Sequence, residues 1–259
     1  MLAVAADAAH SAAEVIRNAA ERGVPLVWEE KGAADFVTEV DRDAESCIVT
    51  HLRAAYPEAA ILGEEFSPAD LISIRGLTFV VDPLDGTTNF LHAYPQYAVS
   101  IAALIDGDVV TGVVLNAANG ELFTATRGGG AHRSGKRISV SAQSDPSHAL
   151  IGTGFPFKKP ELLDEYSGQF VRVSRNTAGI RRAGSAALDL ADVACARFDG
   201  FWELDLAPWD IATGLLLVRE AGGIVTDLGA APKQVAHGPV VAGNPDIHRW
   251  LLKTLHGAS

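Results

Sequence analysis

Residues 82–90 read Asp82-Pro83-Leu84-Asp85-Gly86-Thr87-Thr88-Asn89-Phe90 and directly follow the apolar run Leu77–Val81. The run is short and rich in valine and phenylalanine, which favours a buried strand over a helix. Because proline has no N–H to donate to a neighbouring strand, Pro83 predicts that the strand ends there and that both aspartates lie on a turn. Two carboxylates at the end of a buried strand are suited to binding a cation.

The residues after the second aspartate favour an anion. Gly86 lets another group approach the backbone closely, and Thr87 or Thr88 can cap a following helix. The first N–H groups of a helix have no partner within the helix and attract negative charge. Cation-binding acids beside an anion-binding turn therefore suggest chemistry on a phosphate group.

The composition predicts a globular, cytoplasmic protein. The 259 residues could form one large or two moderate domains, and no uncharged apolar stretch reaches the ~18 residues of a membrane span. The 32 acids exceed the 21 bases, and the resulting formal charge of −11 disfavours nonspecific binding to nucleic acid or anionic membranes. Cys47 and Cys195 lie in helix-like apolar patterns, so we interpret them as buried thiols of a reduced compartment.

One stretch of the chain is locally basic, with Arg172, Arg175, Arg181 and Arg182 close together. A solvated surface is the expected interpretation, and a partner site is the alternative. The eight histidines include neither His-x-His nor His-Glu-x-x-His, so a zinc site built from histidine has no support. Metals that prefer oxygen ligands fit the sequence better.

The chain divides near residue 145. Apolar residues recur at helical spacing in residues 4–20 and 41–55, which predicts two helices. Between residues 98 and 140, strand and turn signals alternate, which predicts an antiparallel meander. Beyond residue 146, strands at 149–152 and 224–226 alternate with helices near 160–173, 185–196, 209–221 and 248–255. We therefore predict an N-terminal α+β domain at 1–145 and a C-terminal α/β domain at 146–259.

Residues 130–136 have the spacing of a phosphate-binding P-loop. Arg137 follows where serine or threonine is required, and Ile138–Val140 is typical of a strand instead of a helix. We interpret the segment as a hairpin turn.

Other acidic motifs lie far apart in the sequence. They are Lys31–Asp41, Gly63-Glu64-Glu65 after a short apolar run, and Trp209-Asp210 at the start of a predicted helix. Magnesium takes oxygen ligands and usually keeps several waters, so a few carboxylates around a phosphate can hold it. Taken singly, Asp41 and Asp210 are also interpretable as helix caps and Glu64 as a solvated loop acid.

Taken in order, these motifs resemble the inositol monophosphatase family. The strongest parts are Gly63-Glu64-Glu65, Asp82–Thr88 and Trp209–Gly214 leading to Glu220–Gly223, and the resemblance covers nearly the whole chain. It implies a layered α-β-α-β-α sandwich, a magnesium-dependent and lithium-sensitive phosphatase, and a homodimer. Residues 1–145 would then carry most metal ligands, and residues 146–259 would carry Asp210 and the residues that select the substrate.

The resemblance implies two to three magnesium ions. Glu64, Asp82 and the carbonyl of Leu84 would hold the first ion, while Asp82, Asp85 and Asp210 would hold the second, so Asp82 would bridge the two. A third, weaker ion near Glu64 would supply the attacking water. Neighbouring cations lower the pKa of bound water and neutralise phosphoryl oxygens, so no covalent nucleophile is needed.

Other roles carry over in the same way. Thr87 and Asp41 would orient and deprotonate the attacking water, so they join Glu64 as catalytic residues. The N–H groups of Gly86 and Thr87 would bind phosphate. Lys31 resembles the family lysine beside the metal site, and a surface charge is its alternative interpretation.

By the same resemblance, Glu203 and Ala186 would select the substrate, and Asp85 and Asp210 would also face the alcohol part of the substrate. An acid beside polyol hydroxyls can accept hydrogen bonds that the wrong substrate leaves unmade, although Glu203 could also be an exposed acid.

The resemblance implies hydrolysis of myo-inositol 1-phosphate or a similar small polyol phosphate by direct attack of metal-activated water. The alternatives are the same chemistry on histidinol phosphate, fructose 1,6-bisphosphate, adenosine 3′,5′-bisphosphate or NADP, and a protein that uses this scaffold to bind RNA or a transcription complex.

Overall fold

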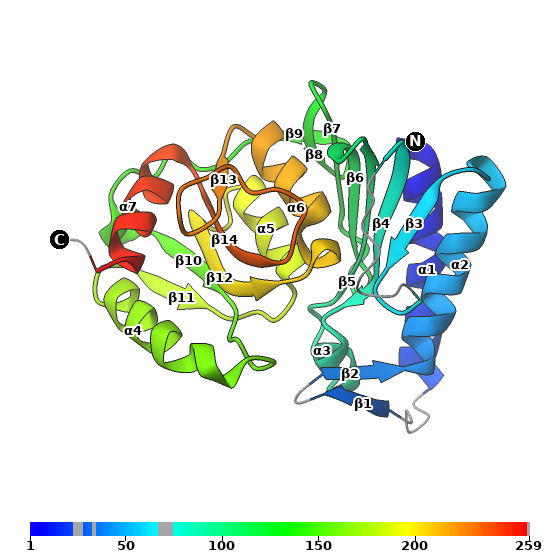
Figure 1. The fold of residues 1–259 in the computed structure, drawn as a ribbon, viewed down its shortest axis with the longest axis horizontal. Helices are drawn as coiled ribbons and strands as arrows, with labels where there is room; N and C mark the ends of the chain where they lie inside the picture. The colour runs from blue at the N-terminus through cyan, green and yellow to red at the C-terminus, as the bar shows by residue number, and fades with distance from the viewer. Residues whose placement is uncertain (23–27, 33–34, 67–74, 258–259) are drawn as a thin grey trace.

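Five layers of secondary structure follow one another across the molecule (Figure 1). The computed structural model describes residues 1–22, 28–32, 35–66 and 75–257, and the side chains of all of these except 28–32 and 35–37. Helices α1 (Leu2–Arg22) and α2 (Glu39–Ala55) cover a seven-stranded sheet, whose other face meets α5 (Ala186–Ala194) and α6 (Pro208–Glu220). A five-stranded sheet follows, and α4 (Leu163–Ser174) and α7 (Pro245–Leu255) cover it on the outside. The predicted α-β-α-β-α sandwich is confirmed.

The seven-stranded sheet has the order β3-β4-β5-β6-β7-β8-β9. Its strands are β3 (Ala60–Gly63), β4 (Leu77–Asp85), β5 (Ala98–Ile105), β6 (Asp108–Asn116), β7 (Leu122–Thr126), β8 (Gly130–Arg133) and β9 (Lys136–Ile138). Only β3 and β4 pair in parallel, so β4 to β9 form the predicted antiparallel meander. The segment with P-loop spacing is the β8–β9 hairpin, as predicted, and it turns at Ser134 and Gly135 with φ angles of 47° and 77°.

Strand β4 does not end at Pro83, so that prediction is wrong. Asp82 pairs with Ser100 of β5, and Asp85 pairs with Ala98, so a three-residue step on β4 faces a two-residue step on β5. This bulge accommodates a residue that cannot donate a ladder hydrogen bond. The N–H of Leu84 donates instead to Asp82 Oδ1 at 3.0 Å, and both acids remain at the carboxyl end of the strand.

The five-stranded sheet has the order β11-β10-β12-β14-β13. Its strands are β10 (Leu150–Thr153), β11 (Gly179–Arg181), β12 (Gly200–Leu206), β13 (Ile224–Thr226) and β14 (Gly238–Gly243). β10 pairs in parallel with β11 and β12, whereas β14 pairs antiparallel with β12 and β13. The sequence did not mark β12 or β14 as strands, and the predicted helix near 160–173 begins as the 3₁₀ turn η2 (Pro160–Leu162).

Four short elements complete the described chain. The strands β1 (Trp28–Gly32) and β2 (Asp35–Thr38) form an antiparallel pair, α3 (Thr87–Leu91) follows β4, and the 3₁₀ turn η1 (Pro146–His148) follows the larger sheet. Within the described ranges, no helix is long and apolar enough to span a membrane.

Helix α6 packs between the two sheets. A Cβ on Gly214 would lie 2.4 Å from a methyl carbon of Leu190 in α5, and a Cβ on Gly112 of β6 would lie 2.8 Å from Thr213. These glycines let the layers approach closely. One apolar core joins residues of both sheets to α5 and α6, and the division near residue 145 stays a prediction.

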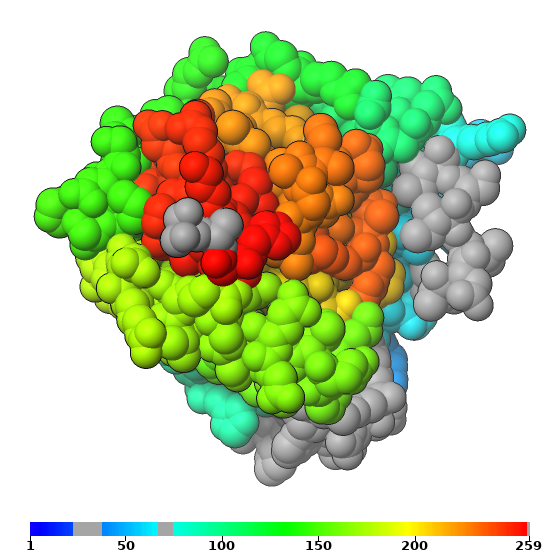
Figure 2. All heavy atoms as spheres, turned by 60° about the vertical axis from the view of Figure 1, so that its left-hand side comes forward, coloured from blue at the N-terminus to red at the C-terminus, as the bar shows by residue number. Residues whose placement is uncertain are grey.

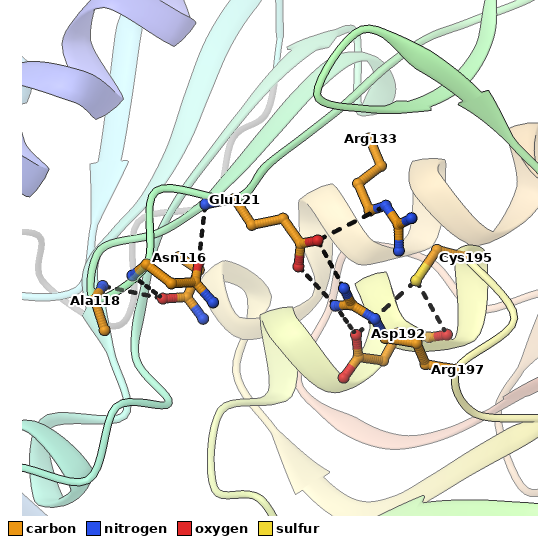
Figure 3. A network of polar contacts seen from close by, with 8 residues as sticks. Asn116, Ala118, Glu121, Arg133, Asp192, Cys195 and Arg197 are labelled. Carbon is orange, nitrogen blue, oxygen red and sulfur yellow. Dashed lines mark hydrogen bonds and ion pairs between the residues drawn. The ribbon is translucent and has the colours of Figure 1, made fainter.

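An ion-pair network also connects the two halves of the chain (Figure 3). Arg197, just after α5, donates two hydrogen bonds of 2.6 Å to Glu121 at the start of β7 and one of 2.9 Å to Asp192. Arg133 of β8 lies 3.7 Å from the same Glu121. Exposed single ion pairs stabilise little, but a two-pronged arginine in a network holds its partners in a fixed orientation.

Both cysteines have free thiols, as predicted, but they are half-buried and not fully buried. Cys47 lies in α2. Cys195 lies at the C-cap of α5, where its thiol contacts the carbonyl of Asp192.

Candidate active site

A cavity of about 800 Å³ lies where β4, α3, α5, β12 and α6 meet. It gathers side chains or backbone from most of the predicted site residues, namely Glu64, Asp82, Leu84, Asp85, Gly86, Thr87, Ala186, Glu203 and Asp210. Residues from both predicted domains therefore line one site. Their individual roles stay predictions.

Asp82 is a deeply buried acid of this cavity, with 1% of its surface exposed. Burial raises its pKa well above the ordinary value, and the nearby carboxylates of Glu64, Asp85 and Asp210 raise it further. A cation among these groups would relieve both the desolvation and the mutual repulsion. The cavity is therefore electrostatically suited to a metal ion.

Asp85 connects β4 to the start of α5. Its Oδ2 accepts hydrogen bonds from the hydroxyl of Ser185 at 2.6 Å and from the N–H of Ala187 at 2.8 Å. Burial raises its pKa, while these hydrogen bonds lower it. The contacts at Oδ2 hold the whole carboxylate in one orientation, as supporting hydrogen bonds do for metal ligands.

Asp210 is the third residue of α6 and not its N-cap, which is Ala207. Its Oδ2 accepts the N–H of Ala207 at 2.7 Å, as an acid in the first turn of a helix often does. Burial raises its pKa, and Glu64 and Asp85 raise it further. The helix-cap interpretation and a metal role are therefore compatible for this residue.

Asp41 lies behind Thr87 and does not line the cavity itself. Its Oδ1 accepts the Thr87 hydroxyl at 2.9 Å, and its Oδ2 accepts the N–H and the hydroxyl of Thr38, the N-cap of α2. Burial raises the pKa of Asp41, and the hydrogen bonds from Thr38 and Thr87 lower it. Asp41 thus belongs to a capping box and also contacts a residue of the cavity wall.

The expectation that Thr87 or Thr88 caps the following helix is wrong. Gly86 is the N-cap of α3, with a φ of 97° and no side-chain cap hydrogen bond. A Cβ there would lie 2.9 Å from the carbonyl oxygen of Gln96, so both the angle and the space require glycine. The Thr87 hydroxyl is instead directed to Asp41 and lies 3.1 Å from the carbonyl of Leu84.

Glu203 projects from β12 into the cavity. Burial raises its pKa to about 8, and the positive charge of Arg182 partly opposes this effect. Gly154 lies directly over the carboxylate, because a Cβ on it would be 2.1 Å from Glu203 Oε2. Ala186, at the first position of α5, is buried and also lines the cavity.

The raised pKa of Glu203 predicts a pH-dependent stability. Between the unfolded value of 4.5 and the folded value of about 8, the folded protein retains a proton that the unfolded chain has released. The free energy of unfolding of the metal-free protein should therefore fall as the pH rises through this window. Glu203→Gln removes this contribution, so the variant should become more stable relative to the natural protein as the pH rises.

Urea unfolding in EDTA, repeated across this pH range, measures the difference in the free energy of unfolding. Identical dependence on pH in the variant and the natural protein would contradict the prediction. Glu58→Gln is the matched control, because it replaces an exposed acid. Its free energy of unfolding should depend on pH as that of the natural protein does.

Sequence reasoning missed several charged residues of the cavity, namely Lys158, Arg182, Asp189, Asp205 and His237. Asp205 accepts a hydrogen bond from Lys159 at 2.7 Å and lies 3.2 Å from His237, so it joins two loops at the rim. Asp189 lies within α5 and Asp205 near the end of β12, whereas the other three lie between helices and strands. No regular spacing in the sequence connects these residues.

The basic stretch does not form one solvated patch. Arg172 donates to the carbonyls of Thr254 and Leu255 in α7, at 2.8 and 2.5 Å. The guanidinium of Arg182 lies 5.4 and 5.0 Å from the ring centres of Phe155 and Phe157 at the cavity. Arg175, Arg181 and Arg182 are exposed, and Arg172 is half-buried.

The donor set of the cavity fits magnesium, because it consists of carboxylate and carbonyl oxygens. As the side chains lie, no three acidic, histidine or cysteine groups within the described residues converge closely enough to hold an ion. Metal binding therefore requires carboxylates to turn toward a common point. Lys31 falls in β1, and its side chain is outside the described part of the chain.

Comparison with known proteins agrees with this fold. The chain is 48% identical over 261 residues to "Nus factor SuhB" of Pseudomonas aeruginosa, covering 98% of this chain and 95% of that protein. It is 47% identical over 229 residues to "Inositol-1-monophosphatase" of Rhizobium meliloti, covering 87% and 84%. The crystal structure of the extragenic suppressor protein suhB from Bartonella henselae superposes with a TM-score of 0.89 and 41% identity, over 97% of this chain and 96% of that one.

A family model matches the chain from residue 1 to residue 259. Together with the cavity and its acids, this match places the chain in the inositol monophosphatase family, a family of phosphatases.

Proposed function

We propose that the protein is a magnesium-dependent phosphomonoesterase that hydrolyses myo-inositol 1-phosphate or a similar small polyol phosphate. The observation that carries the proposal is the group of four acids, Glu64, Asp82, Asp85 and Asp210, that line one cavity. Buried carboxylates that raise one another's pKa are stable together when a cation binds among them. Membership of the inositol monophosphatase family supports phosphatase chemistry.

These four acids and the carbonyl of Leu84 would hold two to three magnesium ions. Bound magnesium would lower the pKa of a nearby water and offset the charge of the phosphoryl oxygens. Asp85 and Asp210 each have one oxygen that accepts a backbone N–H, which is the kind of supporting hydrogen bond that metal-binding carboxylates make.

The chain itself would position and deprotonate the attacking water. Because the Thr87 hydroxyl donates to Asp41, its oxygen can accept a hydrogen bond from a water in the cavity. The water would pass one proton to Thr87 as Thr87 passes its own to Asp41, and its oxygen would attack phosphorus. The bond from phosphorus to the alcohol oxygen would break, and the departing alkoxide would take a proton from solvent water. The N–H groups of Gly86 and Thr87 would bind the phosphoryl oxygens, and the left-handed turn at Gly86 supports this assignment.

Glu203 and Ala186 would select the alcohol. Glu203 lines the same cavity as the acidic end of β4, and a polyol in the cavity could donate a hydroxyl hydrogen bond to it. The small side chain of Ala186 leaves room for a ring. A substrate that lacks the matching hydroxyl would leave the carboxylate without this partner, at a cost of ~1–3 kcal/mol.

Phosphate release from a substrate panel tests this function. The panel contains myo-inositol 1-phosphate, histidinol phosphate, fructose 1,6-bisphosphate, adenosine 3′,5′-bisphosphate and NADP, each with magnesium and with EDTA. We expect magnesium-dependent release that is fastest with myo-inositol 1-phosphate and absent in Asp85→Asn. Preference for another member would retain the chemistry and change the substrate, and no release from any member would reject the proposal.

Binding to a macromolecular partner is the second candidate function. The relative from Pseudomonas aeruginosa is named a Nus factor and not an enzyme, which is the observation that favours it. Arg175 and Arg181 are exposed bases outside the cavity that could contribute. This function predicts that binding to RNA or a transcription complex is retained by Asp85→Asn and lost in Arg175→Ala with Arg181→Ala, whereas catalysis predicts the opposite sensitivity.

We also propose a cytoplasmic homodimer. Large apolar side chains are exposed on α4, namely Leu163, Phe170 and Val171, at 40%, 37% and 43%. Helix α4 lies beside α7 on one face of the molecule, where Figure 2 shows them in yellow-green and red. An apolar face of this kind suits a partner subunit. Sedimentation should give twice the chain mass of 27.2 kDa, and a monomer at micromolar concentration would contradict it.

A further inference from the structure

The proposed metal ligand Glu64 is the first residue of the loop that follows β3. The position of its side chain therefore depends on how that loop is held. On one side, its backbone N–H donates to the carbonyl of Val81 in β4 at 3.2 Å. On the other side, the N–H groups of Glu65 and Phe66 donate to the two carboxylate oxygens of Glu45, at 2.8 and 3.2 Å. The loop is therefore fixed on both sides of Glu64.

Glu45 is buried, with 1% of its surface exposed, and it lies in α2 outside the cavity wall. An acid so deeply buried needs hydrogen bonds to compensate for its lost solvation. The two N–H groups of the loop supply charge-assisted hydrogen bonds of this kind. The carboxylate and the loop therefore stabilise one another.

Gly63 shows how closely the two segments fit. A Cβ on this glycine would lie 2.0 Å from Glu45 Oε1 and 2.5 Å from Glu45 Cδ. The requirement is for space, since Gly63 is not among the residues with a positive φ. Any side chain at position 63 would displace the carboxylate from the loop.

Helix α2 also presents Asp41, one turn before Glu45 and on the same helix face. Asp41 accepts the Thr87 hydroxyl, so the same helix contacts two different parts of the proposed site. The capping box at Thr38 fixes the start of this helix. A rigid helix is thus in a position to set the distance between Thr87 and Glu64.

We propose that Glu45 is a positioning residue for Glu64: its carboxylate holds the loop after β3 so that the Glu64 side chain faces the cavity and binds a divalent cation. This inference rests on the proposed function. Glu45 is not among the described residues that line the cavity, and it contacts the backbone of Glu65 and Phe66 directly after Glu64.

Binding of Mn²⁺ without substrate, measured by the EPR signal of the free ion, tests the proposal. Glu45→Ala should weaken Mn²⁺ binding about 10–100-fold, which is the usual effect of removing a group that orients a metal ligand. Glu45→Gln keeps the shape and one acceptor oxygen, so its effect should be smaller. Gly63→Ala keeps both carboxylates and should weaken binding by displacing Glu45. Asp43→Asn, an exposed acid of the same helix, is the matched control and should bind as the natural protein does.

A double-variant comparison separates positioning from general damage. If Glu45 acts through Glu64, Glu45→Ala should weaken Mn²⁺ binding less than about threefold in a Glu64→Gln background. An undiminished effect in that background, or unchanged binding in both Glu45→Ala and Gly63→Ala, would overturn the proposal. Glu45→Gln remains informative if Glu45→Ala does not fold, and thermal unfolding in EDTA reports this. If the natural protein neither binds Mn²⁺ nor releases phosphate, the proposed function fails, and the inference fails with it.

Discussion

Asp82→Asn should lower kcat/KM by about 10³-fold and should also stabilise the metal-free protein. Asp82 is the proposed bridge between ions, and loss of ~4 kcal/mol of transition-state charge stabilisation corresponds to this factor. The stability effect has the opposite sign. The pKa of Asp82 is raised by burial and by Glu64, Asp85 and Asp210, so near neutral pH the unfolded state loses a proton more readily than the folded state. Folding of the natural protein is therefore penalised above the ordinary aspartate pKa, and asparagine avoids this penalty.

Initial rates with saturating magnesium and urea unfolding in EDTA measure the two effects of Asp82→Asn. Asp108→Asn is the control, because Asp108 is an exposed acid whose ion pair with Arg127 spans 3.3 Å at the surface. It should change neither quantity appreciably. Retention of activity in Asp82→Asn would reject its role, and a large loss of stability in EDTA would show that the acid is structural.

Thr87→Val should lower kcat by about 10²–10⁴-fold while Mn²⁺ binding stays within about threefold of the natural protein. Valine matches threonine in shape but cannot donate to Asp41 or receive a proton from water. Thr87→Ser keeps the hydroxyl and should retain most of the activity. Single-turnover phosphate release and Mn²⁺ EPR together separate a chemical role from a binding role.

Asp41→Asn provides a second test of the same pair. The substitution would leave the Thr87 hydroxyl without its anionic acceptor, so the double variant Asp41→Asn with Thr87→Val should be no slower than Thr87→Val alone. Asp41→Asn should also lower stability, because Asp41 belongs to the capping box of α2. Additive losses in kcat would indicate that the two residues act independently.

For residues 82–90, the sequence predicted the location at the end of a buried strand but not the local backbone geometry. The strand before it, the meander after it and the gathering of Asp82 and Asp85 at the site follow from apolar runs and turn residues. The bulge at Pro83 does not, because it depends on pairing with Ser100 and Ala98 of a strand that comes later in the chain. The expectation that a proline ends a strand considers only the neighbouring sequence, and it does not take into account the strand that pairs with β4.

Strand β12 escaped prediction for a related reason. Glu203 and Asp205 face the cavity, so they interrupt the apolar pattern that marks a buried strand. Functional residues often violate the pattern that specifies the fold. Lys158 and Arg182 were missed because only tertiary folding brings them to the acids.

Glu45 has no sequence signal of its own. Its spacing of four from Asp41 is that of any helix face, and only the fold shows its contacts with the loop after β3. Gly63 was visible as part of an acidic motif, but its need for glycine follows from the Glu45 carboxylate above it.

Anomalous diffraction from crystals soaked in Mn²⁺ tests most directly whether these buried acids form a metal site. We predict at least one strong anomalous peak in the 800 Å³ cavity, within bonding distance of the Asp82 carboxylate, and no such peak in Asp82→Asn crystals. A soak at saturating Mn²⁺ that leaves the cavity without a peak would contradict the proposed magnesium chemistry.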